Sequence, residues 1–329
     1  MDIKDLAGVS EPLKKLIETV SKGIGAVFEP YLIKKKATAN VEVINKLAHA
    51  IKNTPQITKI VKYEHEGLSV VFSNNDLYPE SLDSMERAEA REQYKNIKSQ
   101  ANIESIISQS VIELNSENSI SDEEVNEDWI TRYFNIIGDV SDDLMQGIWA
   151  KILAGEIQKP GSYSLRTLDL LRNLSKEEAI LFNQVAAYAL TENDIDHFLL
   201  HTEQLLAIAK DISYSNIITL IDLGLLSSVD VLYKSELITI NNPHKFFYGD
   251  SLILIECAND QPNLIQFKIT TFTKIGSQLL TLIKKTINED YLLGIRSLIN
   301  SNQQFTVSIA DIINKTATIA TYNNKREIK

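Results

Sequence analysis

Apolar residues recur at helical spacing through most of the first 190 positions of this 329-residue chain. Within residues 12–32 they follow the i, i+3, i+4, i+7 pattern of an amphipathic helix. The predicted face consists of Leu13, Leu16, Ile17, Val20, Ile24, Val27, Phe28 and Tyr31. A second helix is expected from Pro30 to about Lys52. Its first turns carry Lys34, Lys35 and Lys36, where the helix dipole would favour acids.

The middle of the chain predicts a strand pair, a long helix and then four short helices. The strands are expected over residues 57–64 and 68–73, and the long helix over residues 82–114. Residues 121–190 contain two Ser-x-x-Glu sequences, Ser121 with Glu124 and Ser175 with Glu178, which are typical of helix N-termini. Short helices joined by short loops predict a compact helical bundle for this stretch.

The last third changes to a mixed pattern. A short helix that begins near residue 215 and ends at Gly224 is followed by two β-rich stretches, residues 246–257 and 264–273, and this order is typical of a winged helix. The sequence therefore predicts a mainly α protein with a smaller α+β part. Three domains are expected: N-terminal helices with the strand pair and long helix (1–115), a central helical bundle (116–190), and a C-terminal winged-helix-like domain (191–329).

The charge distribution limits the class of partner. The net charge of −11 argues against nonspecific binding of nucleic acid over the whole surface. Residues 1–62 carry eleven lysines against six acids, whereas residues 113–143 carry ten acids and only Arg132. This segregation is typical of a solvated face or of a docking surface. Without a signal peptide or an apolar run of about 18 residues, the expected location is the cytoplasm.

Few residues suggest chemistry. Cys257 is the single cysteine, so no intramolecular disulfide or thiolate cluster is expected. If residues 194–203 are helical, His197 and His201 stand at i, i+4 and are candidate metal ligands, although a solvated helix face is the simpler interpretation. The chain contains no phosphate-binding Gly-rich loop. We therefore expect neither a cofactor nor an enzymatic activity.

A distinctive corner lies between residues 147 and 175. Trp149 has the spacing of a core residue, and Pro160-Gly161 breaks the helical pattern. Glu156 precedes the break and Arg166 follows it, so a carboxylate–guanidinium pair bracing two helices is the preferred interpretation. Catalysis by Glu156 would need a second titrating group, and none lies nearby in the sequence.

The run from Asp128 to Phe182 resembles the signature of a bacterial domain-of-unknown-function family, and residues 6–25, 29–37 and 100–107 resemble its flanking blocks. Trp149, Glu156, Gly161, Ser162 and Arg166 match that signature. The run is also distantly similar to the abortive-infection alpha (Abi-alpha) family. The resemblance implies a bacterial protein with a link to phage defence, and no catalytic residue comes with it.

These observations favour a non-enzymatic anti-phage defence component that acts through a protein partner or as a homo-oligomer. The N-terminal helix has two interpretations: its apolar face packs on the helical core, or it binds a partner groove or the inner face of the membrane peripherally, with Lys34, Lys35 and Lys36 alongside. The alternative function is a DNA-binding regulator or an accessory subunit of a defence nuclease. It is less favoured because the expected groove-reading helix, residues 216–226, has no Lys or Arg.

Overall fold

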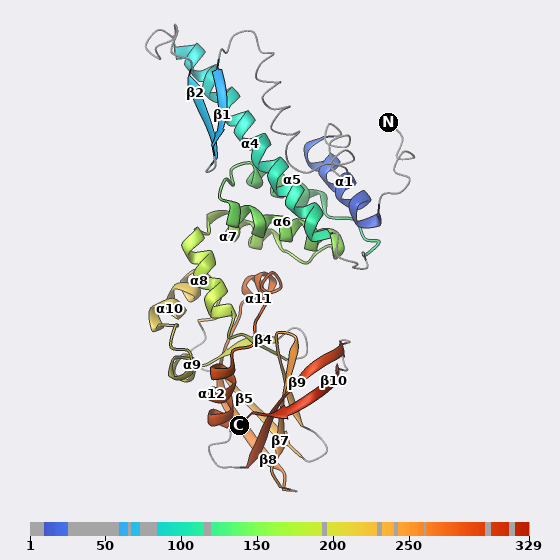
Figure 1. Cartoon of the computed structure of the whole chain (residues 1–329), viewed down its shortest axis with the longest axis vertical. Helices are drawn as coiled ribbons and strands as arrows, with labels where there is room; N and C mark the ends of the chain where they lie inside the picture. Colours follow the sequence, from blue (N-terminus) through green and yellow to red (C-terminus); the bar gives the residue numbers. More distant parts are fainter. Residues whose placement is uncertain are drawn as a thin grey trace. The chain divides into compact units, whose positions relative to one another are not determined.

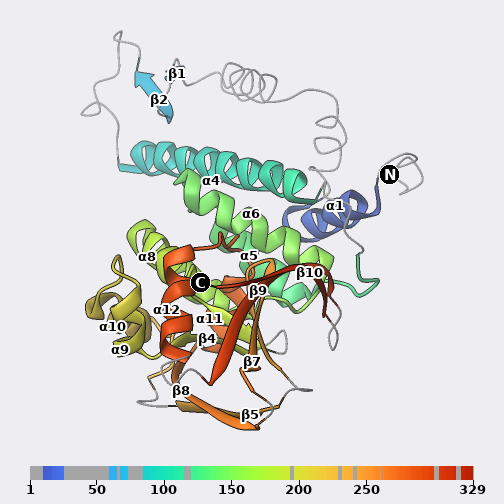
Figure 2. The same cartoon turned by 60° about the horizontal axis from the view of Figure 1, so that its bottom comes forward.

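The computed structural model describes eleven stretches of the chain (Figures 1 and 2). These are residues 10–25, 59–64, 67–72, 84–114, 120–192, 196–228, 232–239, 243–259, 261–299, 304–315 and 320–328. The chain divides into two compact units, Met1–Gly161 and Ser162–Lys329, and each is described here by itself.

The first unit consists of helices and one hairpin. Its elements are α1 (Glu11–Ile24), β1 (Lys59–Glu64), β2 (Gly67–Phe72), α4 (Ser84–Leu114), α5 (Glu127–Ile137) and α6 (Asp143–Gln158). β1 and β2 pair antiparallel, as the sequence predicts. The long helix is also confirmed. Its C-terminal half packs on α6 and α5, and the two views in Figures 1 and 2 agree on this arrangement.

Side-chain caps define where α5 and α6 begin. The predicted helix start at Ser121 is wrong, because residues 120–126 are non-helical and Asn126 caps α5 by accepting a hydrogen bond from the Trp129 amide. One carboxylate oxygen of Asp142 accepts from the amides of Leu144 and Met145 and so caps α6. Both caps satisfy amide groups that the first helical turn leaves without a backbone acceptor.

The second unit contains helices and one antiparallel sheet. The helices are α7 (Leu165–Asn173), α8 (Lys176–Ala186), α9 (Thr202–Ile208), α10 (Tyr214–Asp222), α11 (Lys274–Leu280) and α12 (Glu289–Ile299). The strands are β3 (Leu190–Glu192), β4 (Asp196–Leu200), β5 (Leu232–Ile238), β6 (His244–Tyr248), β7 (Ser251–Cys257), β8 (Asn263–Thr271), β9 (Phe305–Lys315) and β10 (Ala320–Glu327). Their order in the sheet is β10-β9-β7-β6-β3-β4-β8-β5. The capping box of Ser175 and Glu178 at the start of α8 is confirmed.

The prediction of a mainly α protein with a C-terminal winged helix is wrong. The stretch 246–257 is not one strand of a wing but contributes to the β6–β7 hairpin, which turns at Gly249 with a positive φ of 59°. The second β-rich stretch forms β8, which pairs with β4 and β5 rather than with β7. The strands predicted as an isolated ribbon therefore belong to a much larger sheet.

Burial on both faces explains why β7 needs such a sheet. Leu252 and Leu254 lie on one face and pack with Ala310, while Ile253 and Ile255 lie on the other, and all are at most 1% exposed. A two-stranded wing covers at most one face of a strand. A continuous apolar run such as residues 252–255 is stable only as a central strand with neighbours on both sides and cover on both faces.

Candidate functional site

The apolar face of α1 is covered by its own unit. Leu13, Leu16, Ile17 and Val20 are at most 7% exposed, and α1 packs on α4, α5 and α6. Ile24, at the end of the helix, is partly exposed. Val27, Phe28, Lys34, Lys35 and Lys36 lie outside the described residues. Of the two interpretations of this helix, the structure contains the packed arrangement, and membrane contact through the same face would require α1 to leave the unit.

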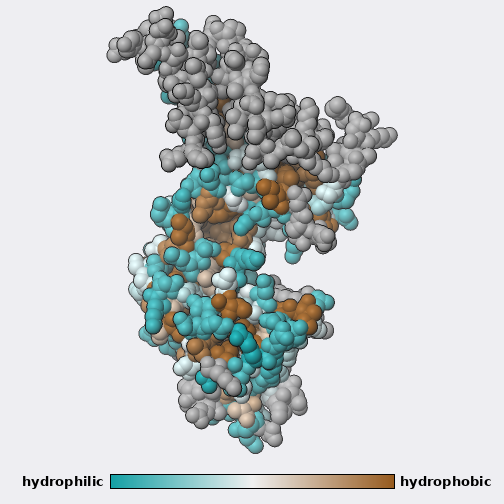
Figure 3. Space-filling view, viewed as in Figure 1, coloured by the Kyte–Doolittle hydropathy of each residue, from teal (hydrophilic) through white to brown (hydrophobic). Residues whose placement is uncertain are grey.

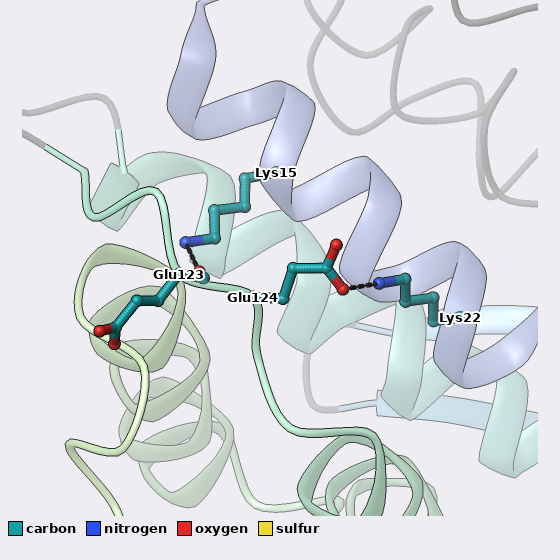
Figure 4. Close-up of polar contacts among 4 residues, drawn as sticks. All are labelled: Lys15, Lys22, Glu123 and Glu124. Atoms are coloured by element: carbon teal, nitrogen blue, oxygen red, sulfur yellow. Dashed lines mark hydrogen bonds and ion pairs between the residues drawn. The ribbon is translucent and has the colours of Figure 1, made fainter.

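Two lysines of α1 hold the acidic segment that precedes α5 (Figure 4). Lys15 Nζ donates to the backbone carbonyl oxygens of Ser121, at 2.8 Å, and Glu123, at 2.5 Å. About two turns later, Lys22 Nζ lies 2.8 Å from Oε2 of Glu124. We call Lys15, Lys22, Glu123 and Glu124 the α1 clamp. The clamp joins the basic N-terminal region to the acidic region 113–143. Its paired residues are about a hundred positions apart in the chain.

The two lysines of the α1 clamp differ in their electrostatics. Burial lowers the pKa of Lys15, against the opposing influence of Asp122, Glu123, Glu18 and Glu124. The hydrogen bond to Glu124 raises the pKa of Lys22, and the same bond lowers the pKa of Glu124. Because Lys22 and Glu124 are largely exposed, water and salt screen their attraction, and such pairs contribute little stability. The apolar face therefore supplies most of the binding energy of α1.

We predict that Gly23→Ala destabilises the first unit. An added Cβ would lie 2.1 Å from Cδ2 of Phe134, whose ring is 5% exposed and cannot move freely. Overpacking of this kind costs about 1–3 kcal/mol, which opposes a gain of about 1 kcal/mol in helix propensity. Denaturant unfolding followed by tryptophan fluorescence measures the result, because Trp129 and Trp149, the two tryptophans of the chain, both lie in this unit. Increased stability would mean that α1 does not pack on α5.

Trp149 is a core residue, as its helical spacing predicts. Its side chain is completely buried in α6. The ring of Tyr133 packs edge-on against it with a centroid distance of 5.5 Å, and the Tyr133 hydroxyl donates to the Trp149 carbonyl oxygen at 2.7 Å. Burial raises the pKa of Tyr133 well above its usual value, so this hydroxyl stays neutral and remains a donor. These contacts fix α5 against α6.

Glu156 stabilises the turn that follows α6. The carboxylate is 1% exposed, and Oε1 accepts a hydrogen bond of 2.7 Å from the Gly161 amide. Gly161 has a φ of +83°, a conformation that glycine adopts without strain. Ser162 is half-buried, and Arg166 is exposed in the first turn of α7. Glu156 and Arg166 lie in different units, and their pairing stays a prediction.

We predict that Glu156→Ala destabilises the first unit by about 1.5–3 kcal/mol, the usual contribution of a hydrogen bond to a charged group. The substitution removes the acceptor of the Gly161 amide and leaves a small cavity. Glu156→Gln keeps an acceptor of the same shape, so its effect should be clearly smaller. Urea titration of both variants measures the difference. Equal stability of Glu156→Ala and the wild type would show that this bond does not hold the corner.

The two candidate metal ligands are not on a helix. His197 lies on β4 and His201 is the residue before α9, so the helical i, i+4 geometry is wrong. Four residues of an extended strand span about 13 Å, too far for two imidazoles to share one ion. Nδ1 of His197 lies 2.9 Å from the Thr191 hydroxyl on the neighbouring strand. Within the described part of the chain, no group of three or more His, Cys, Asp or Glu side chains could hold a metal ion.

The sheet creates a histidine–carboxylate pair that the sequence analysis missed. Nε2 of His244 on β6 lies 3.1 Å from Oε1 of Glu192 on β3, and both side chains are about one-tenth exposed. His244 also packs edge-on against Phe246, at 4.5 Å between ring centroids. More than fifty residues separate the two partners, and only the antiparallel pairing of β3 with β6 brings them together. No local pattern could have identified the pair.

A buried polar network joins α4 to the turn before α6. Asn102 Nδ2 donates to the Gly138 carbonyl oxygen at 2.8 Å, and Gln146 Nε2 donates to that of Val140 at 2.9 Å. Ser105 in turn donates to Gln146 Oε1 at 2.7 Å. These bonds satisfy the backbone carbonyl groups of a turn that would otherwise be buried without partners. The network is structural, and it explains the polar side chains on the packed face of α4.

Comparison with known proteins identifies a family and no function. A family model described as a protein of unknown function (DUF2806) matches residues 86–296. No curated protein and no solved structure matches the chain. Among the described residues, no helix is both long enough and apolar enough to cross a membrane. Because the family model matches more than half of its length, the chain belongs to the DUF2806 family.

Proposed function

We propose that this chain is a non-enzymatic bacterial anti-phage defence component that acts through protein–protein contacts. The link to defence comes from the resemblance of residues 128–182 to the Abi-alpha family. Two polar residues of that stretch have structural roles, since Glu156 accepts a hydrogen bond from the Gly161 amide and Tyr133 joins α5 to α6. The alternative of DNA binding through a winged helix loses its structural basis with the correction of the fold.

The observation that carries the proposal is an exposed apolar pair on the sheet of the second unit. Leu237 on β5 and Leu264 on β8 are directly paired across the two strands, and they are 57% and 60% exposed. β5 is the last strand in the order of the sheet, so one of its edges has no strand partner among the described residues. Figure 3 shows further apolar patches that interrupt the hydrophilic surface. An apolar pair beside a sheet edge is typical of a surface that binds another protein.

The phage test compares plating efficiency on bacteria that lack the gene and on bacteria complemented with the wild type or a variant. We expect protection with the wild type and loss of protection with the double variant Leu237→Lys, Leu264→Lys at equal protein abundance. Leu293→Lys is the matched control, because Leu293 is 42% exposed on α12 and distant in sequence from the pair. Equal plating with and without the wild-type gene over a broad phage panel would refute the defence role. Protection by the double variant would refute the role of this surface.

A further inference from the structure

The outward face of α4 is more apolar than a solvated helix requires. Its packed face holds Asn102, Ile103, Ile106, Ile107, Ser110 and Leu114. At 100° per residue, the opposite face carries Tyr94, Ile97 and Ile112, which are 54%, 38% and 71% exposed. Ala90 and Ala101 lie on the same side. Surface helices normally carry charged residues on the face that points to solvent. These apolar side chains therefore indicate that another surface covers this face of α4.

Four apolar residues of α4 between positions 90 and 101 have the spacing of a coiled-coil seam. Ala90, Tyr94, Ile97 and Ala101 are separated by four, three and four residues, which is the alternation of the a and d positions of a heptad. Residues 84–98 of α4 are solvent-exposed except for the partly exposed Ala90. We call residues 86–101 the α4 seam. Its residues are already helical in the unit, so a partner helix would bind to a preformed surface.

The two flanks of the α4 seam differ in charge. One flank carries Glu86, Gln93 and Gln100 at the g positions of the heptad. The other carries Arg91 and Lys98 at the e positions, both exposed and without an ion-pair partner among the described residues. Residues at e and g form the interhelical contacts that decide which helices pair and in which direction. The charges of the flanks therefore restrict which helix can pair with the seam and in which direction.

We infer that the partner of the α4 seam is the same seam of a second copy, aligned in parallel. In a parallel pair, each g residue faces the e residue five positions later in the other helix. Glu86 then faces Arg91 of the second copy, and Gln93 faces Lys98. An antiparallel pair would set the cationic flank of one helix against that of the other. The charges are thus complementary only in the parallel arrangement, and the inference does not depend on the proposed defence function.

The length of the seam determines the strength of the pair. Two heptads of helix span about 20 Å and bury much less than the about 1,200 Å² of a standard stable interface. The dimer is therefore weak and forms in a concentration-dependent way. It would suit a protein whose copies assemble only when a binding event concentrates them.

Sedimentation velocity of the full chain over a wide concentration range tests the inference. We expect the average mass of the wild type to rise from 37.0 kDa towards twice that value as the concentration increases. Tyr94→Glu and Ile97→Glu should each weaken association by at least about tenfold, because a charge would be buried in the seam. Ile180→Glu, on an apolar residue of similar exposure elsewhere in the chain, is the control and should leave association unchanged.

A charge exchange then separates a parallel homodimer from other partners. Glu86→Arg or Arg91→Glu alone should weaken association, since like charges would face each other, and the double exchange should restore it. A wild type that stays monomeric at all concentrations overturns the inference, as does a double exchange that stays as weak as the single variants. A seam that instead binds duplex DNA or anionic vesicles while the chain remains monomeric also overturns it, and assigns the cationic flank to that ligand.

Discussion

Trp149→Ala should lower the free energy of unfolding of the first unit by about 3–5 kcal/mol, the usual cost of removing a large aromatic side chain from a core. The side chain is completely buried, and the helices around it cannot close the space without changing the contacts that hold α5 against α6. Urea unfolding followed by circular dichroism and by the fluorescence of the remaining Trp129 measures the loss.

Trp149→Phe is the matched control. It keeps an aromatic ring opposite Tyr133 and removes the indole N–H, which finds no acceptor among the described residues. A buried donor without an acceptor is itself unfavourable, so its removal offsets part of the lost packing. We expect a loss well below that of Trp149→Ala. If the alanine variant lost biological activity at unchanged stability, Trp149 would belong to a functional site and not to the core.

Gly276→Ala should destabilise the second unit by about 3 kcal/mol, the upper end of the usual cost of overpacking. An added Cβ would lie 2.1 Å from the carbonyl oxygen of Leu225 and 3.1 Å from Cδ1 of Phe272. The Leu225 oxygen cannot withdraw easily, because it accepts a hydrogen bond of 3.1 Å from the Thr273 amide. This clash exceeds the gain of about 1 kcal/mol that alanine brings to a helix.

Hydrogen exchange of peptides from α11 and β8, together with denaturant unfolding, measures the effect of Gly276→Ala. Ser277→Ala is the control in the same helix, because it adds no atom and improves helix propensity. Exchange in the α11 peptides should accelerate for the glycine variant only. Unchanged exchange in both variants would mean that α11 does not pack against residue 225.

The distinctive residues between positions 147 and 175 have structural roles in packing and in ending α6. Trp149 fills the core between α5 and α6, and Glu156 with Gly161 ends α6. Neither role requires a ligand. Substitutions at these positions should therefore act on stability first, whereas substitutions on the exposed Leu237–Leu264 pair or on the α4 seam should act on partner binding at unchanged stability. This difference separates structural residues from functional ones in any activity assay.

The sequence by itself determined α1, the described helices between residues 84 and 186, and the β1–β2 hairpin. Those elements depend on local signals, namely apolar spacing, the breaks at Gly138 and Pro160-Gly161, and the capping box of Ser175 and Glu178. The core role of Trp149 followed from the same spacing. The predicted start of α5 was wrong. Ser121 and Glu124 match a capping box in sequence, but Asn126 caps the helix.

Only the tertiary structure decided the fold of the second unit. The run His-Phe-Leu-Leu at residues 197–200 is as compatible with a helix as with a strand, and pairing with β3 and β8 makes it a strand. The same pairing separates His197 from His201 and brings Glu192 to His244. In the first unit, packing on α4, α5 and α6 covers the apolar face of α1. The helix pattern shows that this face needs burial, but not which surface buries it. Strand order and partner surfaces are set by contacts between distant residues, so the local sequence cannot determine them.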